Sequence, residues 1–180
     1  LSCLVRYGDI TFPVGYELVH KDVQFCDVAT KQLRRTASVT KNEHFRKLVG
    51  QCHKNQVAFD YVLADNWFGA KENLDYIHRN MKKYFIIGLK SNRTVALSEE
   101  AKIQGKFQQI ETLDMGDGQQ RIVWIKGNSF PIALIKKIFK NEDGSTGILY
   151  LASNDINHDA DTLYQIYQKR WQIEVYHKSI

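Results

Sequence analysis

Two charged side chains near the end of the sequence, Arg170 and Glu174, occupy positions that a helix normally gives to apolar residues. They belong to an inward-facing series at helical spacing: Leu163, Ile166, Tyr167, Arg170, Ile173 and Glu174. A buried charge is costly unless it gains a partner or a ligand. An Arg–Glu pair four residues apart is one interpretation, contributing at most about 0.3 kcal/mol. A charged face directed at a metal ion or a phosphate explains the placement better.

A third candidate, Asp65, ends the nearly continuous apolar run 57–64 (VAFDYVLA), which is typical of a strand covered on both faces. An amphipathic helix is expected over about 70–82, and the apolar run Tyr84–Leu89 follows it. This order predicts a parallel β-α-β unit, and ligands collect at the carboxyl ends of such strands. Judged by itself, Asp65 is better interpreted as a turn or helix-capping residue.

A hairpin is predicted at the start of the sequence. Two strand-like runs, 1–6 and 10–19, flank a Tyr-Gly-Asp turn. Pro13 marks the second run as an edge strand, because proline cannot donate a hydrogen bond to a sheet ladder.

A polar segment and a helix are predicted next. Residues 21–39 carry no clear periodicity and are expected to be irregular. Thr40 and Glu43 then have the spacing of a capping box. Apolar residues at helical spacing predict that the helix continues to about Lys54.

The later part of the sequence changes period and predicts an antiparallel β module inserted into an α/β domain. Its four expected strands are 107–113, 119–126, 130–139 and 146–152. Asn157, Asp159 and Asp161 supply caps for a final helix that is expected to continue to the last residue.

Composition narrows the class of protein. The 180 residues are 43% hydrophobic, enough for one core, and a net charge of +5 with a pI near 9.0 suits a polyanionic partner. The three cysteines lack CxxC spacing and are interpreted as small buried residues, and the histidines lack the spacing of zinc ligands. No apolar run approaches the roughly 20 residues that span a bilayer. A cytoplasmic protein without a membrane partner is expected.

The spacing Tyr167-x2-Arg170-x3-Glu174 matches the beginning of the pattern Tyr-x2-Arg-x3-Glu-x6-Lys. The chain thereby resembles the branch of bacterial insertion-sequence DDE transposases that carries this pattern. The final lysine would fall one position beyond the sequence, and Lys178 is at the wrong offset. Residues 58–68 (AFDYVLADNWF) are similar to the family's second-Asp strand, and the predicted β module lies where the family carries an insertion.

The resemblance implies a ribonuclease-H-like fold, an α/β domain whose mixed sheet gathers three carboxylates around two divalent metals. Mg²⁺ is the expected ion, with Mn²⁺ as the alternative. By resemblance, Asp65 is the second acidic metal ligand and Glu174 the third, and both are catalytic. Tyr167 and Arg170 are implied to contact backbone phosphate near the cut DNA end. The implied partners are transposon ends and target DNA, bound by a homodimer of the full-length protein on the bacterial nucleoid.

The sequence departs from the family in one respect. The first catalytic Asp is expected on a strand that precedes a hairpin like 1–19, and that strand is absent. The family's strand order, 3-2-1-4-5, makes it central. We therefore expect residues 1–90 to be the first part of an incomplete core, 91–152 the inserted module, and 153–180 the core helix with the third acidic residue. The chain alone is expected to be inactive and marginally folded, because two half-sheets would leave unpaired edges.

Three alternatives remain open. A ribonuclease-H-like nuclease or resolvase would use the same metal chemistry without strand transfer, and a non-catalytic transposase remnant would only bind DNA. A glycosidase with Asp65 and Glu174 as its acid pair is a distant third, because nothing in the basic composition supports it. Trp67, Trp124 and Trp171 are candidates for base stacking, although core packing is the better interpretation for Trp124.

Overall fold

The computed structural model describes residues 1–141 and 143–179. Contacts within the chain divide it into two compact units. The first unit comprises Leu1–Phe59 and Ile173–Ile180, and the second comprises Asp60–Gln172. Each unit is described by itself.

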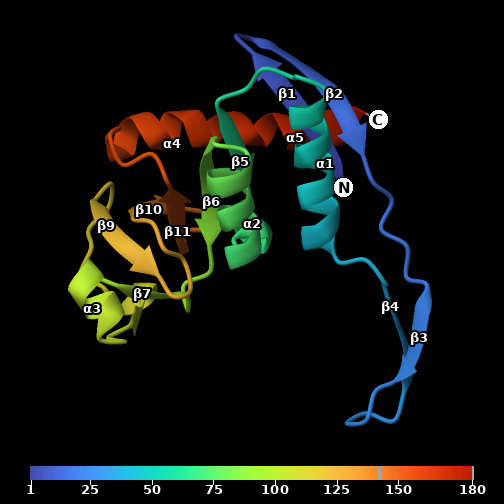
Figure 1. Ribbon diagram of the computed structural model, residues 1–180, viewed down its shortest axis with the longest axis horizontal. Helices are drawn as coiled ribbons and strands as arrows, with labels where there is room; N and C mark the ends of the chain where they lie inside the picture. Colours follow the sequence, from blue (N-terminus) through green and yellow to red (C-terminus); the bar gives the residue numbers. More distant parts are fainter. Residues whose placement is uncertain (142, 180) are drawn as a thin grey trace. The chain divides into compact units, whose positions relative to one another are not determined.

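A seven-stranded mixed sheet forms the second unit, in the order β5-β6-β11-β10-β9-β7-β8 (Figure 1). Its strands are β5 (Tyr61–Ala64), β6 (Tyr84–Leu89), β7 (Thr94–Ala96), β8 (Gln108–Gln109), β9 (Gln120–Ile125), β10 (Ile132–Lys140) and β11 (Thr146–Ser153). Strands β5 and β6 are parallel, and all other neighbouring pairs are antiparallel. The predicted parallel pair and antiparallel strands are confirmed, and they share one sheet. This arrangement agrees with a ribonuclease-H-like fold.

Apolar side chains of the central strands form the core of the second unit. Helix α4 (Ala160–Gln168) covers them with Leu163 and Tyr167, which pack against Ile86 and Leu151. Asp159, one of the predicted caps, begins this helix: its carboxylate accepts a hydrogen bond from the Thr162 N–H at 2.7 Å.

Short helices and turns connect several strands of the second unit. Helix α2 (Lys71–Asp75) continues into the π turn η2 (Tyr76–Asn80), and together they fill most of the helix predicted between β5 and β6. Helix α3 (Glu99–Ile103) and strand β7 were not predicted, because each is too short to show a period. The strand predicted over 107–113 is wrong beyond β8, because a 3₁₀ turn, η3 (Ile110–Thr112), follows at once.

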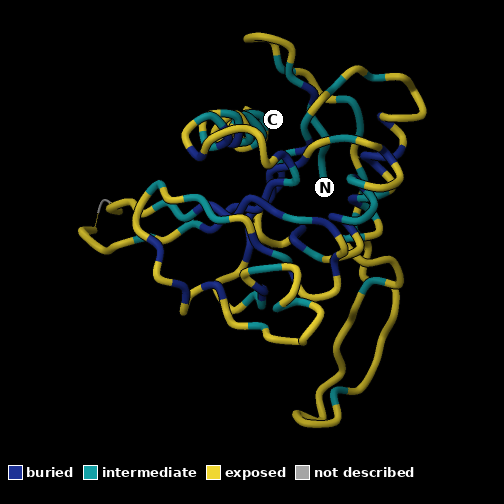
Figure 2. Tube along the Cα trace, turned by 60° about the vertical axis from the view of Figure 1, so that its left-hand side comes forward, coloured by how far each residue is buried: buried dark blue, intermediate teal, exposed yellow. Residues whose placement is uncertain are grey.

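The predicted hairpin and capped helix are confirmed in the first unit. Strands β1 (Ser2–Tyr7) and β2 (Ile10–Tyr16) pair antiparallel, and Gly8 takes the positive φ that their tight turn requires. Helix α1 (Lys41–Lys54) begins with the complete capping box of Thr40. Among the described residues of this unit, the buried ones lie on β1 and α1; buried residues are dark blue in Figure 2.

Residues 21–39 are not irregular, contrary to the prediction. They contain a second hairpin, β3 (Val23–Cys26) and β4 (Leu33–Thr36), whose register is fixed by hydrogen bonds between the two strands. Its eight strand residues are all exposed, so the sequence carries no alternation between buried and exposed faces that could have predicted it.

The cysteines divide into two environments. Cys3 and Cys52 lie with their sulfur atoms 3.7 Å apart, and burial raises the pKa of the Cys3 thiol to about 12. Cys26 is exposed on β3 and Cys3 is half-buried, so the prediction that all three cysteines are buried is confirmed for Cys52 only.

The final helix is not continuous, contrary to the prediction. A 3₁₀ turn, η4 (Lys169–Trp171), separates α4 from α5 (Gln172–Ser179). The predicted last helical position, Ile180, lies outside the described residues. Within the part of the chain that the structure describes, no helix has the length and apolar character needed to cross a bilayer.

Candidate active site

Asp65 lies at the carboxyl end of β5, as predicted, and its side chain is exposed. It caps the short 3₁₀ helix η1 (Asn66–Phe68), because its Oδ1 accepts a hydrogen bond from the Trp67 N–H at 2.9 Å. The capping interpretation is therefore correct, but the capping bond uses only one of the acceptor positions of the carboxylate. An ionised carboxylate offers about four acceptor positions, so one bond orients Asp65 and leaves capacity for a metal ion.

Two glycines bring the Asp65 turn against the neighbouring strand β6. A Cβ on Gly88 would lie 2.7 Å from the backbone nitrogen of Asn66, and a Cβ on Gly69 would lie 2.8 Å from the carbonyl oxygen of Gly88. Both contacts are too short for any side-chain carbon, and backbone atoms cannot rotate away. The close approach of turn and strand therefore requires glycine at both positions.

Two side chains hold the far end of this turn. The amide of Asn73, which is fully buried, donates a hydrogen bond to the carbonyl oxygen of Phe68 at 3.0 Å. The guanidinium of Arg93 donates to the carbonyl oxygen of Gly69, and burial lowers the pKa of Arg93. These positioning residues were not predicted, since only the folded chain brings them to the turn.

An exposed aromatic residue follows the candidate metal ligand. Trp67 is 56% exposed, and the Nζ atom of Lys90 lies 5.6 Å from the centroid of its ring. Lys90 comes directly after β6, so both side chains belong to the carboxyl end of the parallel pair. This edge of the sheet thus combines a carboxylate, an aromatic face and a cation.

Glu174 lies on α5, where its side chain is exposed. The expectation that the apolar series continues as a buried face is confirmed for Leu163 and Tyr167 but is wrong for Glu174. Asp65 belongs to the second unit and Glu174 to the first, and each is described in its own unit. That the two carboxylates share one metal site stays a prediction.

Tyr167 and Arg170 form a contact with each other. Tyr167 is only 3% exposed, and the guanidinium carbon of Arg170 lies 5.5 Å from the centroid of its ring. Core packing therefore accounts for the Tyr167 ring, whereas Arg170 is partly exposed. A role for either residue in binding DNA stays a prediction.

The oxygen donors of the candidate site suit a hard cation. Carboxylates at exposed positions are the ligands that Mg²⁺ and Mn²⁺ take in proteins, while most of their other sites are filled by water and phosphate. Among the residues that the structure describes, no group of three or more His, Cys, Asp or Glu side chains is arranged to hold a metal. The carboxylates of Asp65 and Glu174 are donors of this type, and their binding of a metal ion stays a prediction.

Three polar residues of the second unit, Tyr61, Asp155 and His158, form a hydrogen-bonded cluster. Tyr61 and His158 both bind Oδ2 of the buried Asp155, the latter through Nδ1 at 2.7 Å. Burial raises the pKa of Tyr61, as does its hydrogen bond to Asp155. Burial also raises the pKa of Asp155, but the hydrogen bonds from Tyr61 and His158 outweigh it and the net shift is downward. The cluster ties the start of β5 to the segment that precedes α4.

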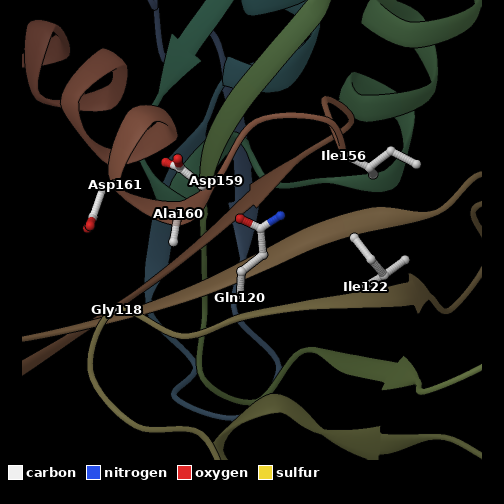
Figure 3. Close-up of a pocket in the computed structure, with 7 residues that line it drawn as sticks. All are labelled: Gly118, Gln120, Ile122, Ile156, Asp159, Ala160 and Asp161. Carbon is white, nitrogen blue, oxygen red and sulfur yellow. The ribbon is translucent and has the colours of Figure 1, made fainter.

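Figure 3 shows a hollow where β9 meets the beginning of α4. Its volume is about 500 Å³. The two carboxylates in its lining already have partners, because Asp159 caps α4 and Asp161 lies 3.6 Å from Lys137 Nζ. Neither Asp65 nor any residue of the Tyr167–Glu174 segment lines the hollow, so it is separate from the candidate active site. Its lining residues are Gly118, Gln120, Ile122, Ile156, Asp159, Ala160 and Asp161.

The chain matches a known protein family. The family model described as "Transposase DDE domain" matches residues 22–180. No curated protein matches the sequence. The matched range contains Asp65 with its turn and the helical segment that carries Tyr167, Arg170 and Glu174.

Proposed function

This chain belongs to the transposase DDE domain family, and from that premise we propose that it is catalytic-domain material of a DNA transposase. The reaction proposed is metal-dependent cleavage of a DNA strand, followed by transfer of the cut end to target DNA through in-line phosphoryl displacement. The observation that carries this proposal is the family match over residues 22–180. The geometry of the Asp65 turn supports it.

The family generally uses a divalent metal, and we propose Mg²⁺, with Mn²⁺ as a substitute, at a two-metal site. Asp65 and Glu174 are the proposed ligands from this chain. When bound, the metals would activate the attacking oxygen and stabilise the leaving one. Asp65 can serve this purpose because its capping bond and the glycine contacts behind it fix its direction before the ion arrives.

DNA is the partner that the family implies. We propose that Arg170 contacts a backbone phosphate through its planar fork, with the ring of Tyr167 beneath it limiting the motion of the guanidinium. The burial of Tyr167 supports this indirect role better than a direct one. We further propose a cytoplasmic, nucleoid-associated enzyme that acts as a homodimer on paired transposon ends.

The chain alone is proposed to be inactive. Strand β5 is the outermost strand of its sheet, and β1 and β2 form a separate two-stranded sheet. A further strand carrying the first catalytic Asp would pair beside β5, where the family's strand order expects it. Activity is therefore to be tested on this chain joined to the upstream part of the transposase.

The test compares Asp65→Asn and Glu174→Gln with Asp114→Asn, a control at an exposed aspartate in the second unit. Each active-site substitution should reduce Mg²⁺-dependent cleavage of a transposon-end duplex by about 10³-fold or more, the scale seen when catalytic groups are removed. The control should cleave normally. Unchanged cleavage in both active-site variants would exclude the proposed ligands.

The products separate the remaining alternatives. A transposase joins the cut end to target DNA, whereas a nuclease or resolvase of the same fold only cuts. DNA binding without cleavage, with the upstream part present, would identify a non-catalytic remnant.

A further inference from the structure

All eight strand residues of the hairpin β3–β4 are exposed, whereas β1 and β2 each contain partly buried residues. Its apolar side chains are on the surface as well: Phe25 is 43% exposed and Leu33 is 72% exposed. A two-stranded hairpin without a packed face is marginally stable in water. The sequence nevertheless specifies this hairpin in detail at both of its ends.

At the open end, Asp22 joins the two strands. Its carboxylate accepts hydrogen bonds from the Ser38 N–H at 2.7 Å and from the Ser38 hydroxyl at 2.6 Å. These bonds lower the pKa of Asp22, because they stabilise its ionised carboxylate.

At the tip, Asp27 has the same function. Its Oδ1 accepts hydrogen bonds from the N–H groups of Ala29 and Thr30, and its Oδ2 lies 3.1 Å from the guanidinium of Arg34. Lys31 closes the turn with a φ of 53°. Both carboxylates of the hairpin thus stabilise its shape.

The register decides which side chains share a face. Gln24 lies directly opposite Arg35, and Cys26 opposite Leu33. Because side chains alternate along a strand, these four point to one face of the ribbon. Gln24 and Arg35 are therefore neighbours on an exposed surface, on a backbone whose ends are fixed.

The hairpin also has an excess of positive charge. Residues 21–38 contain four Lys or Arg residues and two Asp residues. The hairpin segment therefore carries a net charge of +2, and Lys31 and Arg35 are exposed on it, so its surface has a positive potential. Such a surface attracts a polyanion.

From these observations we infer that the hairpin β3–β4 is a DNA-binding ribbon that enters the major groove, with Arg35 and Gln24 directed at base edges and Lys31 at the backbone. The major groove admits a two-stranded ribbon, and Arg and Gln are the side chains that bind guanine and adenine through paired hydrogen bonds. The inference rests on the proposed function only in taking DNA as the partner. A second copy of the chain fits less well, because a two-fold pairing of the same surface would bring its cations together.

The test measures binding of the 180-residue chain to a fluorescein-labelled 40-bp duplex of mixed sequence, by anisotropy in EDTA over a series of salt concentrations. Arg35→Ala and Gln24→Ala should each weaken binding by about tenfold. Arg35→Lys keeps the positive charge but loses the paired N–H donors of the guanidinium, so it should weaken binding while keeping the salt dependence. Lys31→Ala should reduce the salt slope by about one.

Lys106→Ala is the matched control, since it removes one exposed cation outside the hairpin, and it should bind as the parent chain does. Circular dichroism establishes that each variant keeps its fold, and sedimentation gives its mass. Parent-like binding by all four hairpin variants would overturn the ribbon, and so would failure of the parent chain to bind the duplex. A change of mass without a change of binding would assign the surface to a second copy instead. None of these outcomes alters the cleavage test, which decides the proposed function separately.

Discussion

The two compact units differ in how completely they bury their apolar residues. In the part of the chain that the structure describes, the largest fully buried side chains all belong to the second unit, among them Phe85, Ile86 and Leu163. Val49, the best-buried of the apolar core residues of the first unit, keeps 6% of its surface exposed. Burial of apolar surface is the main stabilising contribution to folding, so the second unit carries most of the stability.

The two predicted metal ligands, Asp65 and Glu174, differ in the same way. Asp65 extends from a turn that packs against strand β6, in which every residue except Tyr84 is buried. Glu174 extends from α5, a helix in which no described residue is buried. One carboxylate is thus fixed by its own unit, whereas the other depends on contacts that the first unit supplies less firmly.

Hydrogen exchange should show the largest contrast. Amides of β6 should open with free energies at least about 3 kcal/mol above those of α5, because local opening ranges from near zero up to global unfolding. Exchange of the 180-residue chain followed by mass spectrometry measures both segments in one experiment. Equal protection of β6 and α5 would show that the first unit is as stable as the second.

Substitution of Gly88 should give the next largest effect. Gly88→Ala should reduce the free energy of unfolding by about 1–3 kcal/mol, since its Cβ would meet the backbone of Asn66 at 2.7 Å. Gly116→Ala is the control, because a Cβ there meets only the Gln119 side chain at 3.5 Å. Urea unfolding monitored by fluorescence measures both. If the two variants lose equal stability, the close contact at Gly88 is not what holds the turn.

Removal of each carboxylate should have the smallest effect on stability. Asp65→Ala should reduce the free energy of unfolding by about 1 kcal/mol through loss of the cap, whereas Asp65→Asn keeps a capping oxygen and should change it little. Glu174→Ala, on an exposed helix surface, should cost less than about 0.5 kcal/mol. The same urea titrations check all three. A cost for Glu174→Ala as large as that for Asp65→Ala would mean that α5 is as firmly packed as the turn.

Elements with strong local signals were predicted correctly from the sequence. Helix α1 follows from the spacing of Thr40 and Glu43, and β6 from an apolar run that only a covered strand would carry. The hairpin β3–β4 and helix α3 were missed, because short polar segments take their conformation from cross-strand pairing and caps. The helix break at η4 was missed for a similar reason, since nothing in the local sequence marks it.

The sequence by itself determined the family, the position of Asp65 at the end of its strand and the order of the candidate residues, because these follow from local apolar pattern and motif spacing. Only the tertiary structure decided that Gly88, Asn73 and Arg93 support the Asp65 turn. It also decided that Tyr167 is buried while Glu174 is exposed, although both belong to one helical series. The physical reason is that close contacts and burial depend on which distant segments pack together, and spacing along one segment carries no such information.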